Sequence, residues 1–118
     1  MRFLGLLRAD THSENGNPPS PELIERMGKF TEEITRAGVL ISSEGLQPSS
    51  KGARVKLSGG KFQVTDGPFT ETKELVASYA LLEVPSMADA IYWTKRFLEV
   101  LGEGECEIRS VMDNLAVC

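Results

Sequence analysis

The segment VTDGPFTETKEL, residues Val64–Leu75, decides how the rest of the chain is arranged, because it places turn formers and ionisable side chains between two apolar, strand-like runs. Asp66 can accept hydrogen bonds from backbone amides two or three residues further on, and Pro68 fixes φ for a tight turn after Gly67. The sequence therefore predicts a sharp turn, with the charges that follow it held beside the turn.

Periodicity on both sides of this turn predicts the order of the elements. Strands are expected over residues 3–9, 39–46, 75–84 and 105–112, helices over 21–37 and 86–101, and a β-hairpin over 53–65. This order predicts an α+β fold, a ferredoxin-like split βαβ sandwich of the dimeric α/β barrel type, with a hairpin inserted before the Asp66 turn. The helices of such a fold cover one face of the sheet, so an apolar second face predicts a homodimer.

The composition is typical of a soluble, folded protein. The 118 residues are 41% hydrophobic and 25% charged, with a net charge of -4, which suits a single domain spanning residues 1–118. An acidic balance argues against nucleic acid as the partner, because proteins that bind it usually carry a basic face. No apolar run approaches the ~20 residues that span a bilayer, so we expect a cytoplasmic protein that does not bind membranes.

The candidate functional residues gather around the turn. Asp66 is the candidate catalytic residue, since a carboxylate can act as general acid or base where burial shifts its pKa. The candidate ligand-binding residues are Glu44, Arg54, Asp66, Glu71 and Lys73. Arg54 lies on the basic face of the predicted hairpin, which could meet an anionic ligand or remain a solvated face. Glu44, at a strand end, could line a cleft or protect a sheet edge.

Other kinds of site have weaker support. The polar residues 10–20 are predicted to form a mobile loop, and the only histidine, His12, lies in it, where a solvated side chain is the usual role. A carboxylate metal site of Glu44, Asp66 and Glu71 is a weak alternative. The sequence has no glycine-rich phosphate loop, no Gly-x-Ser-x-Gly elbow and no His/Cys ligand set. No metal and no cofactor are therefore expected.

Residues 64–74, with the strand containing Tyr79, resemble the signature of the DGPF subgroup of the YCII-related proteins. The similarity extends over nearly the whole chain, including Thr31–Val39 and Ser43–Pro48. It implies a ferredoxin-like fold that dimerises through its sheet, in a bacterial family whose DGPF members are often encoded beside extracytoplasmic-function sigma factors. It implies no known reaction. Other members are associated with a His-Asp pair, but the helix position of that histidine falls near Met27 here, which cannot transfer a proton.

These observations predict a small dimeric protein that binds a small polar ligand in a cleft near Asp66, with a link to a sigma-factor circuit implied by the resemblance alone. One alternative is a small enzyme, a hydrolase, isomerase or lyase, that uses Asp66 as general acid or base. A second alternative is a protein-interaction module acting through an exposed sheet or helix surface. A concave site with Arg54, Lys73 or Glu44 converging on Asp66 would favour the ligand-binding or enzymatic hypothesis.

Overall fold

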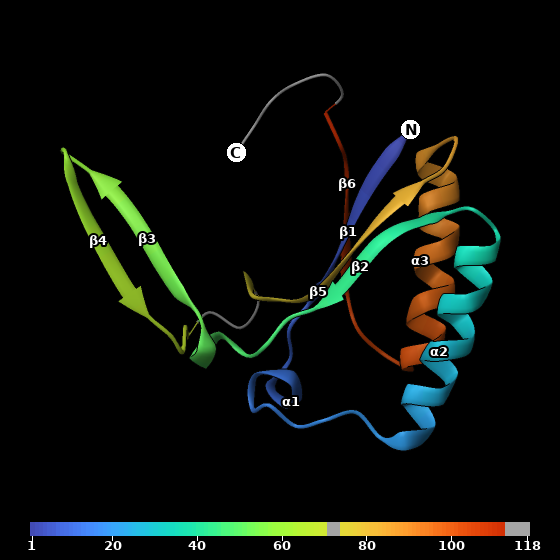
Figure 1. The fold of residues 1–118 in the computed structure, drawn as a ribbon, viewed down its shortest axis with the longest axis horizontal. Coiled ribbons are helices and arrows are strands. Elements are labelled where there is room, and N and C mark those ends of the chain that lie inside the picture. The colour runs from blue at the N-terminus through green and yellow to red at the C-terminus, as the bar shows by residue number, and fades with distance from the viewer. Residues whose placement is uncertain (71–73, 113–118) are drawn as a thin grey trace.

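The computed structural model describes residues 1–70 and 74–112 of the chain. Figure 1 shows its elements, which are β1 (Arg2–Arg8), α1 (Thr11–Glu14), α2 (Pro21–Arg36), β2 (Leu40–Gly45), the 3-10 turn η1 (Ser49–Lys51), β3 (Ala53–Ser58), β4 (Lys61–Asp66), β5 (Val76–Glu83), α3 (Met87–Leu101) and β6 (Cys106–Ser110). The predicted strands, hairpin and two long helices are present in the predicted order. None of the described helices is both long enough and apolar enough to cross a membrane.

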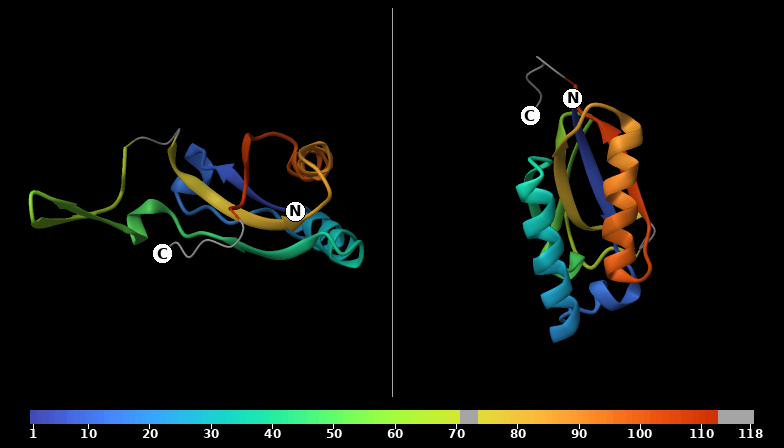
Figure 2. Two further views of the ribbon diagram at one scale, coloured as in Figure 1. Left: turned by 90° about the horizontal axis from the view of Figure 1, so that it is seen from above. Right: turned by 90° about the vertical axis from the view of Figure 1, so that its right-hand side faces the viewer.

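The main sheet has four antiparallel strands in the order β2-β5-β1-β6. The two long helices, α2 and α3, lie side by side on one face of this sheet, as the right-hand view of Figure 2 shows. The chain is therefore α+β with an antiparallel sheet, which is consistent with a ferredoxin-like or dimeric α/β barrel fold.

Strand alternation sorts the side chains of the main sheet onto two faces. Phe3 of β1 lies opposite Leu82 of β5, and both are buried under the helices, with Phe3 only 2% exposed. Their neighbours along the strands, Leu4 and Leu81, project from the other face. The buried core consists of Phe3, Phe30, Ile34, Val39, Leu82, Val84 and Ala90. We call the other face the open sheet face and define it by Leu4, Leu6, Tyr79 and Leu81.

Both long helices begin at the serines that the sequence indicates. The Leu23 amide donates to Ser20 Oγ over 3.2 Å, and Pro21 occupies the first turn of α2. The Asp89 amide donates to Ser86 Oγ over 3.3 Å at the start of α3, and Gly102 ends that helix at φ +93. These caps satisfy terminal backbone groups and fix the helix ends over the sheet.

The segment 10–20, predicted as a loop, contains the short helix α1. The Ser13 amide donates to Asp10 Oδ1 over 2.7 Å and the Asp10 amide donates to Ser13 Oγ over 3.0 Å, so the two residues form a capping box. The hydrogen bond from the Ser13 amide holds the pKa of Asp10 below its ordinary value. Four residues are too few to show a helical period, so alternation and spacing could not reveal this helix.

Strands β3 and β4 form a second, separate sheet of two strands that projects from the body of the molecule. We call residues 53–66 the arm. In Figure 1 the two long helices, α2 and α3, lie at one end of the molecule and the arm at the other, with the main sheet between them. The arm therefore extends on the side of the open sheet face.

Candidate functional site

The turn after β4 is bound closely to the linker that precedes the arm, residues 46–52. Asp66 is the last residue of β4, lies opposite Ala53 and is exposed. The Gly67 amide donates to the Gly52 carbonyl over 3.0 Å, and the peptide bond between Gly67 and Pro68 is cis. The Phe69 amide donates to Ser49 Oγ over 3.0 Å. The turn thus joins the two ends of the arm at its base.

A carboxylate from the N-terminal segment completes this junction. Glu14 of α1 accepts from the Ser49 amide at Oε2 over 2.9 Å, and the Ser49 hydroxyl donates to Oε1 of the same carboxylate. Ser49 therefore links Glu14 to the Phe69 amide in one partly buried chain of hydrogen bonds. Neither residue could be selected from the sequence, because Glu14 and Ser49 are 35 positions apart and match no motif.

The structure separates the predicted site residues. Arg54, on the arm, places its guanidinium 3.9 Å from the centre of the Phe69 ring, a cation–π contact at the base of the arm. Glu44 lies on β2 opposite Tyr79 and is exposed. Glu71 and Lys73 lie outside the described residues. Among the residues that are described, no three His, Cys, Asp or Glu side chains are grouped to hold a metal ion, and the set that includes Glu71 stays a prediction.

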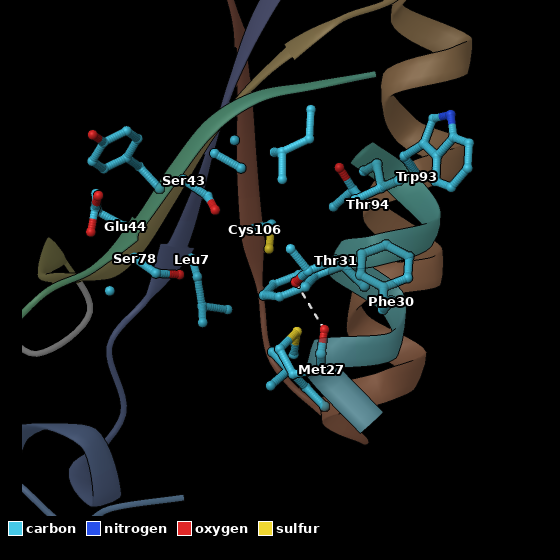
Figure 3. A pocket seen from close by; sticks show the side chains of 18 of the residues that line it. Leu7, Met27, Phe30, Thr31, Ser43, Glu44, Ser78, Trp93, Thr94 and Cys106 are labelled. Atoms are coloured by element: carbon cyan, nitrogen blue, oxygen red, sulfur yellow. Dashed lines mark hydrogen bonds between the residues drawn. The ribbon is translucent and has the colours of Figure 1, made fainter. Parts of the chain in front are cut away.

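A sizeable cavity lies elsewhere, between the two long helices and the sheet. This cavity has a volume of about 640 Å³, within the ~300–1,000 Å³ range of small-molecule sites. Figure 3 shows α2 contributing Met27, Phe30 and Thr31, and α3 contributing Trp93 and Thr94. Of the predicted site residues that the structure describes, Glu44 is among the residues at the cavity, although its carboxylate points away from the helices (Figure 3), whereas Arg54 and Asp66 do not line it.

The walls of the cavity are mostly apolar, and the few polar groups differ in their availability. The hydroxyls of Thr31 and Thr94 donate to the carbonyls of Met27 and Ala90, each over 2.8 Å, and are thus used within their own helices. Ser43 and Ser78 project from the sheet on the helix side, since Ser78 lies opposite Leu7. Neither hydroxyl makes a hydrogen bond within the described part of the chain, so both can serve a ligand.

An ion pair joins the helices that form the outer wall. Arg96 of α3 donates from Nη2 to Glu33 Oε1 of α2 over 2.7 Å. The same guanidinium lies 5.7 Å from the centre of the Phe30 ring and 5.5 Å from that of Trp93. The hydrogen bond from Arg96 lowers the pKa of the Glu33 carboxyl. Charge and ring contacts together hold α2 beside α3 above the cavity.

Cys106 of β6 also lines the cavity and provides a chemical probe of it. Burial raises the pKa of this thiol, and the charge of Glu105 adds to the effect. A smaller thiolate fraction reacts more slowly with electrophiles. We therefore expect iodoacetamide to alkylate Cys106 more slowly at pH 8 in the folded chain than in urea, with the pH midpoint of the rate moved upward.

This expectation is best measured by mass spectrometry in a Cys118→Ser background, which leaves one thiol in the chain. A folded-state midpoint at or below that of the unfolded chain would contradict it.

The chain was compared with protein-family models, with curated protein sequences and with solved structures. The family model of the YCII-related domain matches residues 1–114. No curated protein sequence matches significantly. Among solved structures, the 5-chloro-2-hydroxyhydroquinone dehydrochlorinase of Burkholderia phenoliruptrix AC1100, in complex with 2,5-dihydroxybenzoquinone, has a similar fold, with a TM-score of 0.51, 12% sequence identity and coverage of 95% of this chain and 94% of that one. The match over residues 1–114 shows that the chain belongs to the YCII-related domain family.

Proposed function

We propose that this protein binds a small ring compound carrying hydroxyl or carbonyl groups in the cavity between the helices and the sheet. The observation that carries the proposal is the cavity itself, about 640 Å³ with apolar walls and the unengaged hydroxyls of Ser43 and Ser78 on its floor. Apolar walls favour the body of such a compound, and two neighbouring hydroxyls can orient its polar groups.

The ligand class of the structural neighbour supports this proposal. That protein is a dehydrochlorinase in complex with 2,5-dihydroxybenzoquinone, a flat ring with polar oxygens. The two proteins share a fold at 12% identity, so the neighbour suggests a class of ligand for this chain and no reaction.

Binding without acid-base catalysis fits the residues of the cavity better than an enzymatic role. Met27 occupies the helix position near which the resemblance places a histidine, and a thioether can neither donate nor accept a proton in catalysis. Glu44 projects from the face of β2 opposite to Ser43, away from the helices. Catalysis by Asp66 stays the alternative, and it would take place at the base of the arm, outside the cavity.

We also propose that the protein is a DGPF-subgroup homodimer. The subgroup rests on the turn at Asp66–Phe69. The dimer rests on the open sheet face, whose Leu4, Leu6 and Leu81 are partly exposed and lie on the side of the sheet away from the two long helices. Pairing two such faces would remove this apolar surface from water.

Calorimetry with 2,7-dihydroxynaphthalene tests the ligand proposal, because this compound has a flat apolar body and two hydroxyls and is chemically stable. We expect saturable binding that slows alkylation of Cys106, since the thiol lines the same cavity. Replacing both Ser43 and Ser78 with alanine should weaken binding on the order of tenfold, because each hydrogen bond contributes about 0.5–1.5 kcal/mol.

The matched control is Ser58→Ala, which removes a hydroxyl from the arm and should leave the affinity unchanged. Absence of saturable binding, or equal affinity in the wild type and the Ser43/Ser78 double variant, would reject the proposal.

A further inference from the structure

One face of the arm is a continuous apolar surface in water. The register pairs Val55 with Val64 and Leu57 with Phe62, so these four side chains share one face. Their exposed fractions are 69%, 64%, 61% and 74%. Single exposed apolar residues are common on proteins, but four adjacent ones on a projecting element mark an interaction surface.

The arm also lacks the support that a hairpin ordinarily needs. Within the described residues, β3 and β4 pack against each other, and no other strand or helix packs closely on them. An isolated two-stranded hairpin is at best marginally stable in water and needs a further surface against its apolar face. The radius of gyration, 16.0 Å, exceeds the roughly 13–14 Å of a compact chain of this length, as expected for an arm extended from the body.

The base of the arm is nevertheless firmly attached, so its direction is determined by the body. The Gly67 amide bonds the Gly52 carbonyl across the two ends of the arm. The Phe69 amide bonds Ser49, which in turn bonds Glu14. These contacts determine the direction in which the arm extends from the body. The turn at Asp66–Phe69 makes two of them and thus helps to set that direction.

The arm and the open sheet face border the same side of the molecule. The left-hand view of Figure 2 shows the two long helices on one side of the main sheet, and Figure 1 shows the arm on the other. The open sheet face presents Leu4, Leu6, Tyr79 and Leu81 to that side. A single occupant beside the open sheet face would therefore lie within reach of the arm.

Charge favours an acidic occupant. The arm carries Arg54, Lys56 and Lys61 against the single carboxylate of Asp66, a net charge of +2. The whole chain has a net charge of -4, so the remainder carries -6. The body of a second copy is thus an electrostatically suitable partner for the arm. A twofold axis would let each body receive the arm of the other.

We propose that the arm docks through Val55, Leu57, Phe62 and Val64 on a second copy of this chain, which packs against the open sheet face. This rests on the proposed sheet-to-sheet dimer, and adds that each subunit holds the other with its arm. The turn at Asp66–Phe69 then serves association, because it sets the direction of the arm.

Sedimentation equilibrium of the full-length chain, without any ligand, tests this proposal. The wild type should be a dimer at micromolar concentration. The variant L57S/F62S should raise the dimer dissociation constant at least tenfold, because it places two hydroxyls in the apolar contact. The matched control, Q63S/T65S, alters the opposite face of the same strand pair and should leave the constant within twofold. Leu81→Lys, on the open sheet face, should also raise it at least tenfold.

Each outcome decides a part of the proposal. A wild type that stays monomeric to 200 µM, or a dimer that L57S/F62S does not weaken, overturns arm docking. A dimer that L57S/F62S weakens while Leu81→Lys does not overturns the sheet-to-sheet placement. Ligand binding in the cavity is measured separately by calorimetry, so failure there and failure here are distinguishable.

Discussion

Replacing Phe30 with alanine should lower the free energy of unfolding by about 3–5 kcal/mol, the usual range for deleting a buried aromatic ring. Phe30 is 7% exposed, and its ring centre lies 6.3 Å from those of both Trp93 and Phe97. The change would remove the ring that joins α2 to α3 and would enlarge the cavity beside it. The loss should appear as a lower midpoint in urea-induced unfolding followed by tryptophan fluorescence.

A second phenylalanine supplies the control for this prediction. Phe62 on the arm is 74% exposed, so Phe62→Ala, measured at low protein concentration, should change the free energy of unfolding by less than about 0.5 kcal/mol. Equal effects of the two substitutions would show that Phe30 is not a core residue.

The local elements could be predicted from the sequence because their signals are local. Alternation places Phe3 and Leu4 on opposite faces of β1, and the register with β5 confirms it. The cap serines Ser20 and Ser86 are also recognisable from their immediate neighbours. By contrast, the four-residue helix α1 depends on two reciprocal hydrogen bonds between Asp10 and Ser13, which no hydrophobic period reports.

The cavity could not be predicted, because it depends on contacts between distant parts of the chain. Ser43 lies on β2 and Ser78 on β5, which are far apart in the sequence and become neighbours only in the folded sheet. Met27 lines the same cavity from helix α2. The sequence predicts a site at Asp66 because ionisable side chains can be recognised in a sequence. An apolar cavity formed by distant segments cannot be recognised in this way. Of the charged residues predicted for the site, Arg54 contacts the Phe69 ring at the base of the arm, and the role of Asp66 stays a prediction.

The sequence predicts a tight turn at Asp66–Phe69, and the structure adds the reason for its glycine. A Cβ on Gly67 would lie 1.7 Å from the carbonyl oxygen of Ser49 and 2.6 Å from its carbonyl carbon. No flexible side chain can yield there, because both atoms belong to the backbone of the linker. Glycine is thus required at this position by the close approach of the linker to the turn.

Gly67→Ala should therefore destabilise the fold by about 3 kcal/mol, near the upper end of the usual cost of overpacking. Relief of the contact would move the linker and break the hydrogen bonds from the Gly67 amide to Gly52 and from the Phe69 amide to Ser49. The effect should appear both in the urea midpoint and as faster hydrogen exchange of the Phe69 amide.

Gly45→Ala is the matched control, because a Cβ at Gly45 meets nothing within 4 Å. That substitution should leave stability unchanged or raise it by about 0.4–1 kcal/mol through the lower entropy of the unfolded chain. A Gly67→Ala chain with wild-type stability and a protected Phe69 amide would show that the linker does not approach the turn. If the arm nevertheless lost its attachment while the body stayed folded, exchange would be faster at Phe69 and unchanged at Leu82 in the core. That pattern would show that the turn holds the arm in position and contributes little to the stability of the main sheet.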